Sequence, residues 1–382
     1  MTPPVGAEDP AILQVALVTV GPGEVYWERF GHNAILFQES RTGETRLYHF
    51  GVFDFGAEDF FLEFIRGRMA YLAVRASTRE LHAYRAHGRS VDVQWLRLDP
   101  PQAHALLEHL DEHVQPENAR YRYHYYEQNC STKLRDALDL ATGGAVRRAL
   151  EGRSRGVTYR WHTRRLTAPE PWLFLGTHAG LSGYADRPID YWEEAFIPME
   201  LARRLREVEV VDAAGRRVPL VAREQRLAEA KLAPPPDSPR SLRLAFLGVG
   251  LALAAGLVAL SRVGARRTLA VTRFVLWLVA GVGGLVLAAL WLGTEHRSAW
   301  ANENLLLFDP LALALVPAAC WARWRGTRAA RTIAWLVAAG VAFALFAKAL
   351  PGFRQDNLDW ILLWLPIHLA LAIGLAREPR AA

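Results

Sequence analysis

The C-terminal half of the chain is a series of uncharged apolar runs separated by short polar breaks. Five of these runs have about the length that a helix needs to cross the hydrocarbon core of a bilayer, roughly 20 residues. They are Leu244–Ser261, Phe274–Thr294, Leu305–Ala322, Thr332–Ala347 and Trp360–Ala376. The pattern predicts a five-helix, all-α transmembrane domain over residues 244–376.

Arginines in the breaks between these runs predict the orientation of the helices. The second and fourth breaks carry one arginine each, Arg297 and Arg354. The first and third breaks carry four each: Arg262, Arg266, Arg267, Arg273, Arg323, Arg325, Arg328 and Arg331. Because positive residues remain on the cytoplasmic side, we expect a multi-pass protein of the bacterial inner membrane. Residues 1–240 are expected in the periplasm and the C-terminus in the cytoplasm.

An exported N-terminal domain requires a signal, and the chain does not begin with one of the usual form. Met1–Pro10 has no basic region, and Ala11–Val20 is short and is better interpreted as a strand. We therefore expect that a signal peptide is missing from this chain or that its start codon is misassigned. The alternative is a cytoplasmic domain with a misleading arginine pattern.

The first half mixes strand and helix patterns. Alternating or β-branched runs predict strands at Ala11–Val20, Asn33–Phe37, Thr45–Val52, Ala70–Ala76 and Val91–Leu98. Helical spacing predicts helices at Asp59–Arg66, Pro101–His113 and Ser131–Ala141. These elements show no regular βαβ order, which favours an α+β fold.

Three further segments complete the predicted organisation. Arg120–Tyr126 alternates tyrosines with basic residues, which predicts a strand with one aromatic face. Val208–Val221 is interpreted as a hairpin turned at 213–215. The proline-rich residues 231–243 are expected to link a domain at 1–230 to the helices at 244–376.

Composition excludes several classes of protein. The 382 residues are 51% hydrophobic with a net charge of +6, which excludes a disordered chain. The arginines are not interleaved with aromatic platforms, so nucleic-acid binding is not expected. We find no metal-ligand cluster and no phosphate, nicotinamide or flavin motif, so no metal and no cofactor is expected.

Cys130 is the first candidate for catalysis. The only other cysteine, Cys320, falls in a predicted membrane span, so Cys130 is expected to be an unpaired thiol in an oxidising compartment. Asn129 is a suitable N-cap for the helix that Cys130 opens. The positive end of the helix dipole is expected to lower the pKa of the thiol. Free N–H groups at Asn129–Ser131 could hold an oxyanion. A buried structural cysteine is the alternative.

Two histidines are candidate partners of the thiol. His32 follows Gly31 and leads into a predicted strand, and His49 lies on the next strand. Two adjacent antiparallel strands would bring His49 beside His32, where it would orient the imidazole of the base. A core histidine without a catalytic role remains the alternative at both positions. His82, His87, His104, His109 and His113 are expected on solvated helix surfaces.

Several motifs recur in the order of a known family. They are Pro22-Gly23, Phe30-Gly31-His32, Phe50-Gly51-Val52-Phe53-Asp54-Phe55, Asn129-Cys130-Ser131-Thr132, Arg135-Asp136 and Gly183-Tyr184-Ala185-Asp186. This half resembles the periplasmic domain of the Lnb lipoprotein N-acyltransferase family. The membrane half resembles that family's five-helix domain at His296, Asn302, Asn304 and Asp309-Pro310. The order of His and Asn-Cys is also similar to circularly permuted papain-like folds of the NlpC and lecithin:retinol acyltransferase types.

The resemblance implies a membrane-bound cysteine acyltransferase. Cys130 would take an acyl chain from a phospholipid donor, with His32 as base and His49 as the third member. The thioester would pass the chain to the N-terminal amine of a diacylglyceryl lipoprotein. His296, Asn302, Asn304 and Asp309 would form a membrane-side site, although Asp309 can equally cap a helix. A cysteine hydrolase of amides or esters and a non-enzymatic membrane assembly protein are the alternatives.

Overall fold

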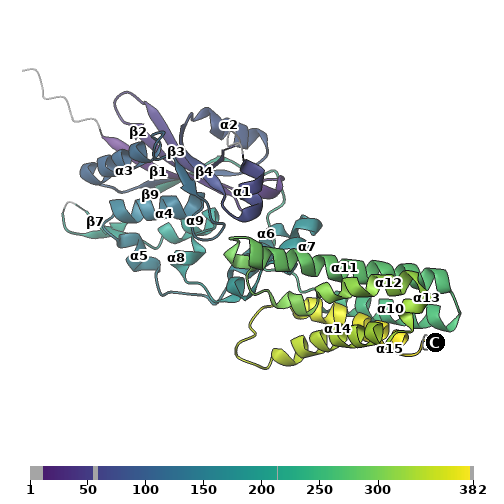
Figure 1. The fold of residues 1–382 in the computed structure, drawn as a ribbon. Coiled ribbons are helices and arrows are strands. Elements are labelled where there is room, and N and C mark those ends of the chain that lie inside the picture. Colours follow the sequence, from purple (N-terminus) through teal and green to yellow (C-terminus); the bar gives the residue numbers. More distant parts are fainter. Residues whose placement is uncertain (1–11, 55–58, 213, 379–382) are drawn as a thin grey trace, which may run out of the picture. The chain divides into compact units, whose positions relative to one another are not determined.

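The computed structural model describes residues 12–54, 59–212 and 214–378 and divides into two compact units (Figure 1). Unit 1 comprises residues 1–157 and 188–236, and unit 2 comprises residues 158–187 and 237–382. Residues 158–187, which the sequence analysis placed in the N-terminal domain, therefore group with the helical unit. The domain bounds 1–230 and 244–376 stay a prediction. Ala11, Phe55, Ala213 and the stretch before residue 11 lie outside the described residues.

Unit 1 is built on a seven-stranded sheet of order β6-β4-β3-β2-β1-β5-β9, in which all neighbours are antiparallel. The strands are β1 (Leu13–Val20), β2 (His32–Glu39), β3 (Thr45–Phe53), β4 (Ala70–Ala76), β5 (Val91–Leu96), β6 (Arg120–Arg122) and β9 (Val221–Ala228). The five strands predicted from alternation are confirmed. The α+β class is confirmed at the level of a sheet-rich mixed domain.

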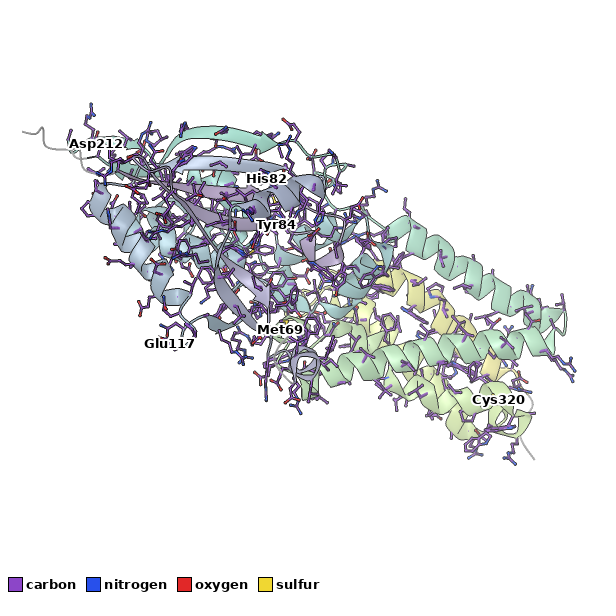
Figure 2. All side chains as sticks on the ribbon, turned by 90° about the horizontal axis from the view of Figure 1, so that it is seen from above. Met69, His82, Tyr84, Glu117, Asp212 and Cys320 are labelled. Carbon is purple, nitrogen blue, oxygen red and sulfur yellow. The ribbon has the colours of Figure 1, made fainter. Side chains whose placement is uncertain are left out.

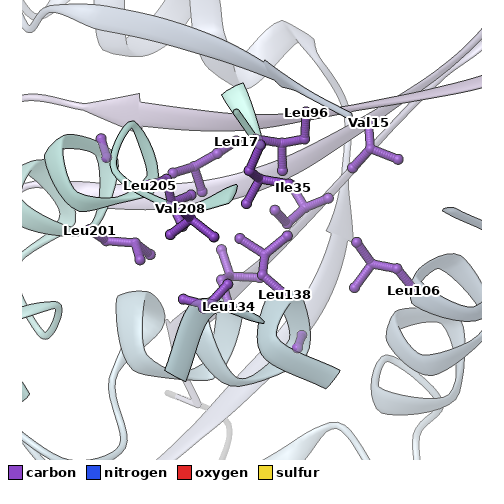
Figure 3. Close-up of a cluster of buried hydrophobic side chains, with 14 of the residues drawn as sticks. Val15, Leu17, Ile35, Leu96, Leu106, Leu134, Leu138, Leu201, Leu205 and Val208 are labelled. Atoms are coloured by element: carbon purple, nitrogen blue, oxygen red, sulfur yellow. The ribbon is translucent and has the colours of Figure 1, made fainter. Parts of the chain in front are cut away.

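Alternation along the strands gives the sheet two apolar faces. Val15, Leu17 and Ile35 face helices α3 (Pro100–His113), α4 (Cys130–Ala141) and α9 (Pro198–Leu205), as Figure 3 shows for Leu134 and Leu138 of α4. Ala16, Val18 and Leu36 point to the other face, where Leu81 and Tyr84 of α2 (Arg79–Ala86) cover them. Burial on both faces fixes the register, since a slip of one residue would exchange the two sets.

The smaller elements of unit 1 agree only in part with the sequence. Helix α1 (Phe60–Arg66) and the hairpin of β7 (Glu209–Val211) and β8 (Arg217–Pro219) are confirmed. The strand predicted at Arg120–Tyr126 is wrong beyond Arg122, because the chain turns and His124 pairs with Gln128. Strand β9, α5 (Ala145–Leu150), α8 (Tyr191–Glu194) and the 3-10 helix η1 (Tyr26–Glu28) were not predicted.

Unit 2 contains four described helices that are long and apolar enough to cross a membrane. These are α10 (Arg243–Arg262), α11 (Arg266–Gly293), α14 (Arg328–Ala347) and α15 (Leu358–Ala376). They coincide with four of the five predicted spans. Their shared core contains Trp277, Trp360, Trp364 and Leu371.

The single helix predicted at Leu305–Ala322 is wrong. This stretch forms η4 (Glu303–Leu306), η5 (Pro310–Leu315), α12 (Val316–Cys320) and the start of α13 (Ala322–Arg325), and η3 (Arg297–Ala299) precedes it. Two prolines explain the breaks, because Pro310 and Pro317 each lie in the first turn of a new helical segment, where proline is tolerated. The segments before and after residue 308 are bent by 45°, so the unit has up to five spans if the bent pair counts as one.

Three short segments from before the apolar helices also belong to unit 2: α6 (Tyr159–Thr167), α7 (Pro171–Gly180) and the 3-10 helix η2 (Gly183–Asp186). Buried ion pairs fix them. Arg160 binds Asp186 through two nitrogens at 2.7 and 2.9 Å, and Arg164 and His178 both contact Asp359 at the start of α15. The Gly183-Tyr184-Ala185-Asp186 motif therefore supplies a structural carboxylate.

Candidate active site around Cys130

Cys130 is the first residue of α4, as the sequence predicted. The Asn129 side-chain oxygen accepts the backbone N–H groups of Ser131 and Thr132, both at 2.9 Å, and Thr132 Oγ1 accepts the N–H of Asn129. This reciprocal cap satisfies N–H groups that the start of a helix otherwise leaves without partners. Asn129 thus already accepts the N–H of Ser131, and the role of that group towards an oxyanion stays a prediction.

The first turn of α4 is attached to the sheet through Asn33, a residue the sequence analysis did not single out. Ser131 Oγ lies 2.9 Å from Asn33 Oδ1 and 2.6 Å from the carbonyl oxygen of Ala195. Asn33 Nδ2 donates to Thr19 Oγ1 at 2.9 Å. Asn33 and Ser131 are both fully buried. Asn33 also points its backbone N–H at the Cys130 thiol. The residue after His32 thus contacts the thiol.

His32 and His49 lie side by side, as the strand pairing predicted. His49 pairs with Ala34, and the two imidazole rings meet edge to face with their centroids 4.9 Å apart. His49 Nε2 lies 3.2 Å from Glu80 Oε2 of α2. Tyr84, labelled in Figure 2, is on the same helix, and its ring centroid is 6.2 Å from that of His32. The histidine pair is therefore held on the face that α2 covers.

Two glycines shape the backbone beside these groups. Gly31 has φ +82°, and a Cβ there would lie 2.6 Å from Met199 Sδ and 2.8 Å from the carbonyl oxygen of Val20. Gly51 has φ +100° in the irregular pairing of β3 with β4, and its Cβ would lie 3.6 Å from Cys130 Cβ. Both backbones occupy conformations that favour glycine. At position 31 glycine is also required because a Cβ would overlap with neighbouring atoms.

Arg89 is a buried cation at the same end of the sheet and was not predicted. Its Nε donates to the carbonyl oxygen of Gly21 at 2.8 Å, and its Nη1 lies 3.0 Å from Glu28 Oε1. The guanidinium lies over the ring of Tyr84 at 5.1 Å. Among the described residues its buried Nη2 has no hydrogen-bond partner. Nothing in the sequence around Gly88-Arg89-Ser90 distinguishes it from a surface turn.

The protonation states of the pair differ from the prediction. Desolvation raises the pKa of the half-buried Cys130 thiol to about 11, although the N–H groups of Asn33 and Ser131 and the Arg89 cation act to lower it. The expectation of a depressed pKa is therefore wrong, because burial outweighs these N–H groups and the Arg89 cation. Burial, with His49 and Arg89 adding to it, holds the pKa of His32 well below its ordinary value. At neutral pH the pair is a thiol and a neutral imidazole, which can accept a proton.

A tyrosine cluster lines the other side of the thiol. Tyr71 of β4 stacks on Tyr123 with ring centroids 4.1 Å apart, and Tyr121 packs on Phe50 at 5.7 Å. Desolvation raises the pKa of Tyr71, Tyr121 and Tyr123, and the nearby Cys130 adds to the shift in each. These side chains stay neutral and give Cys130 an apolar wall. The predicted aromatic face at 121–125 thus borders the candidate nucleophile.

The residues proposed for a membrane-side site have structural partners in unit 2. Asn302 Nδ2 donates to the carbonyl oxygens of Ala179 and Gly180 at 3.0 and 2.9 Å, and Asn304 Nδ2 donates to Ala179 at 2.8 Å. The structure brings these two asparagines together and fastens α7 to them.

The other three positions of unit 2 lie in different settings. Asp309 caps η5 by accepting the N–H of Leu311 at 2.9 Å, and His296 precedes η3. Cys320, labelled in Figure 2, is exposed at the end of α12.

These features define a membrane protein in which a sheet-rich domain, with a cysteine at a helix start and a histidine pair on neighbouring strands, precedes a set of apolar helices. Residues 6–168 match the family model of the Lnb N-terminal periplasmic domain, and residues 242–374 match that of the Lnb transmembrane domain. The chain belongs to the Lnb family, as its motifs predicted. No curated protein and no solved structure gives a significant match. Family membership indicates a lipoprotein-modifying membrane enzyme of the acyltransferase kind with a periplasmic N-terminal domain.

Proposed function

We propose that this protein is a thiol-dependent lipoprotein N-acyltransferase. The acyl donor is a phospholipid, and the acceptor is the N-terminal amine of a diacylglyceryl lipoprotein. One observation carries the proposal: the Cys130 thiol opens a capped helix against the backbone of Asn33, and Asn33 directly follows His32, whose ring meets that of His49. A nucleophile next to a base that a third group orients is the usual arrangement for covalent catalysis.

The first half-reaction forms a thioester. His32 takes the proton of the Cys130 thiol as the sulfur attacks the ester carbonyl carbon of the donor. The tetrahedral intermediate then expels the alkoxide of the lysophospholipid, which receives that proton from His32. The neutral resting states of the two groups suit this order, because the proton moves only when the sulfur attacks.

The second half-reaction forms the amide. The neutral amine of the lipoprotein attacks the thioester carbonyl carbon, and the sulfur leaves. His32 accepts the proton of the amine and returns it to the sulfur, so that the enzyme ends as it began. Each half-reaction thus moves one proton through the same imidazole.

The remaining groups have supporting roles in this scheme. His49, held at Glu80, orients the ring of His32. The backbone N–H groups of Asn33, Ser131 and Cys130 face the sulfur and are the candidate donors to the oxyanion, although Asn129 also accepts that of Ser131. The fold we propose for this domain is permuted papain-like, which the position of β1–β6 before the nucleophile helix supports. The inner membrane, with the C-terminus in the cytoplasm, is the proposed location.

Mass spectrometry of lipoprotein N-termini tests this function. Cells that lack the gene should accumulate diacylated lipoproteins with a free N-terminal amine, and the wild-type gene should restore the third acyl chain. A Cys130→Ala gene is the matched control and should restore nothing. Unchanged N-terminal acylation in the deleted strain, or release of free fatty acid without amide formation, would instead indicate a hydrolase or a non-enzymatic protein.

A further inference from the structure

Unit 1 carries an exposed apolar surface on η1 and α1. We call it the η1–α1 surface, and it consists of Val25, Trp27, Phe61, Leu62 and Ile65. Phe61 is 76% exposed, Ile65 63% and Trp27 53%. Large apolar side chains that gather on a surface, rather than lie scattered over it, indicate a binding site.

Helix α1 departs from the usual pattern of a surface helix. Its sequence, Phe60-Phe61-Leu62-Glu63-Phe64-Ile65-Arg66, is apolar on nearly every side, and none of its residues is buried. A helix that is apolar all round is normally enclosed in a core or a membrane. Glu63 and Arg66 neutralise each other through an ion pair at 3.0 Å. The helix therefore presents apolar side chains to its surroundings with almost no charge.

The η1–α1 surface is continuous with the candidate active site. The ring centroids of Trp27 and Phe53 are 6.1 Å apart, and those of Phe53 and Tyr71 are 4.8 Å apart. Tyr71 stacks on Tyr123, and both lie near enough to Cys130 to interact with it electrostatically. This row of aromatic rings leads from the exposed surface to the thiol.

We propose that the η1–α1 surface is a lipid-binding surface and that its occupant is an acyl chain of a membrane phospholipid. In the bilayer the surface inserts among the lipid chains, and the aromatic row guides one of them to Cys130. The guidance of an acyl chain to Cys130 is the second step and rests on the proposed function. The insertion of the surface among the lipid chains is the first step and does not. The site thus selects donors that present a long apolar chain.

Two observations favour lipid over a protein partner. The chain carries helices of membrane-spanning length and composition, so a bilayer is always within reach of this domain. Trp and Tyr are the side chains that prefer the membrane–water interface, and η1 contributes both.

Depth-dependent quenching tests the surface without any reference to catalysis. The full chain with Cys130→Ala and Cys320→Ala receives one new cysteine, by Phe61→Cys or Ile65→Cys, labelled with a nitrobenzoxadiazole dye. The matched control is Leu140→Cys on α4, an apolar residue of unit 1 that is 65% exposed. The proteins are placed in nanodiscs of phosphatidylglycerol and phosphatidylethanolamine with or without doxyl-labelled lipid.

The proposal predicts blue-shifted emission and several-fold stronger doxyl quenching at positions 61 and 65 than at 140. Equal, weak quenching at all three positions would overturn it. Shielding of position 61 that develops only when a lipoprotein is added would also overturn it, because the occupant would then be a protein.

Turnover tests the second step. Phe61→Asp combined with Ile65→Asp should reduce acyl transfer from bilayer phospholipid by about tenfold or more, and Leu140→Asp should leave it unchanged. A short-chain ester in free solution should react equally with the parent, the double variant and Leu140→Asp, because it needs no interfacial site. Equal loss on both donors would contradict the acyl path. Absence of turnover in the parent would count against the proposed function alone, since the quenching result stands independently.

Discussion

The hydroxyl oxygen of Ser131 lies 2.9 Å from the side-chain oxygen of Asn33, and this contact joins the helix that begins at Cys130 to the strand that begins at His32. Both residues are fully buried. The proposed nucleophile is on a helix that packs on one face of the sheet, whereas the proposed base is on a strand of the sheet itself. Their relative position therefore depends on a few polar contacts at this point.

Ser131→Ala should consequently reduce both stability and turnover. The substitution leaves a buried oxygen of Asn33 without its donor, which costs about 1–3 kcal/mol. Thermal unfolding in detergent and acyl transfer, measured on the same preparation, check this. Ser238→Ala, at an exposed position, is the control and should behave like the parent. If Ser131→Ala keeps full turnover and the parent's unfolding midpoint, the contact does not position the site.

The pH dependence of thioester formation should show one limb on the acid side. His32 must be neutral to accept the thiol proton, and its pKa lies well below 6.5, so the rate should rise with pH through that lowered pKa. Cys130, with a pKa of about 11, should add no limb until the pH approaches that value. Rapid-mixing experiments without the amine acceptor check this. A second limb between pH 6 and 9 would instead indicate a preformed thiolate–imidazolium pair.

Arg89 should shift the pH dependence of thioester formation without taking part in the reaction. Its charge lowers the pKa of both His32 and Cys130, so removing it should move the acid limb towards neutral pH and slow thioester formation. Arg89→Gln alone would leave the half-buried carboxylate of Glu28 without its partner, which is destabilising in itself. The double variant Arg89→Gln with Glu28→Gln removes both charges and is the better test. Arg89→Lys should preserve the limb, and an acid limb that does not move in the double variant would exclude the electrostatic role.

Asp309 offers a test of the membrane-side residues. It accepts the N–H of Leu311 at the start of η5, and asparagine is an equally good residue for that position. Asp309→Asn should therefore keep both stability and turnover, and Asp309→Ala should lose about 1 kcal/mol of stability. Thermal unfolding and acyl transfer separate the two outcomes. Loss of turnover in a stable Asp309→Asn protein would show that the carboxylate takes part in the reaction.

Local patterns predicted the elements around the site well. Alternation predicted the five central strands because both faces of the sheet are buried. Asn129 predicted the start of α4 because its cap is a local interaction. Strand neighbours then placed His49 beside His32. The broken third span also had its signals in the sequence, since Pro310 and Pro317 interrupt it.

Features that depend on distant parts of the chain were not predicted, and the pKa of Cys130 was predicted to shift in the wrong direction. Arg89 is buried only because β1, β5 and η1 meet around it. The pKa of Cys130 reflects a balance between the helix start and desolvation, and the apolar wall of tyrosines that helps decide this balance comes from β4 and β6. Asn33 follows the predicted base directly, yet its bond to Ser131 joins positions 98 residues apart.

Trapping the acyl-enzyme tests the central claim most directly. The full chain in nanodiscs is incubated with radiolabelled phospholipid and no lipoprotein, then digested and analysed by mass spectrometry. The account predicts a hydroxylamine-sensitive acyl group on the peptide that contains Cys130, unchanged in Cys320→Ala and absent in Cys130→Ala and His32→Ala. An acyl group on Cys320, or full acyl transfer by Cys130→Ala, would contradict it.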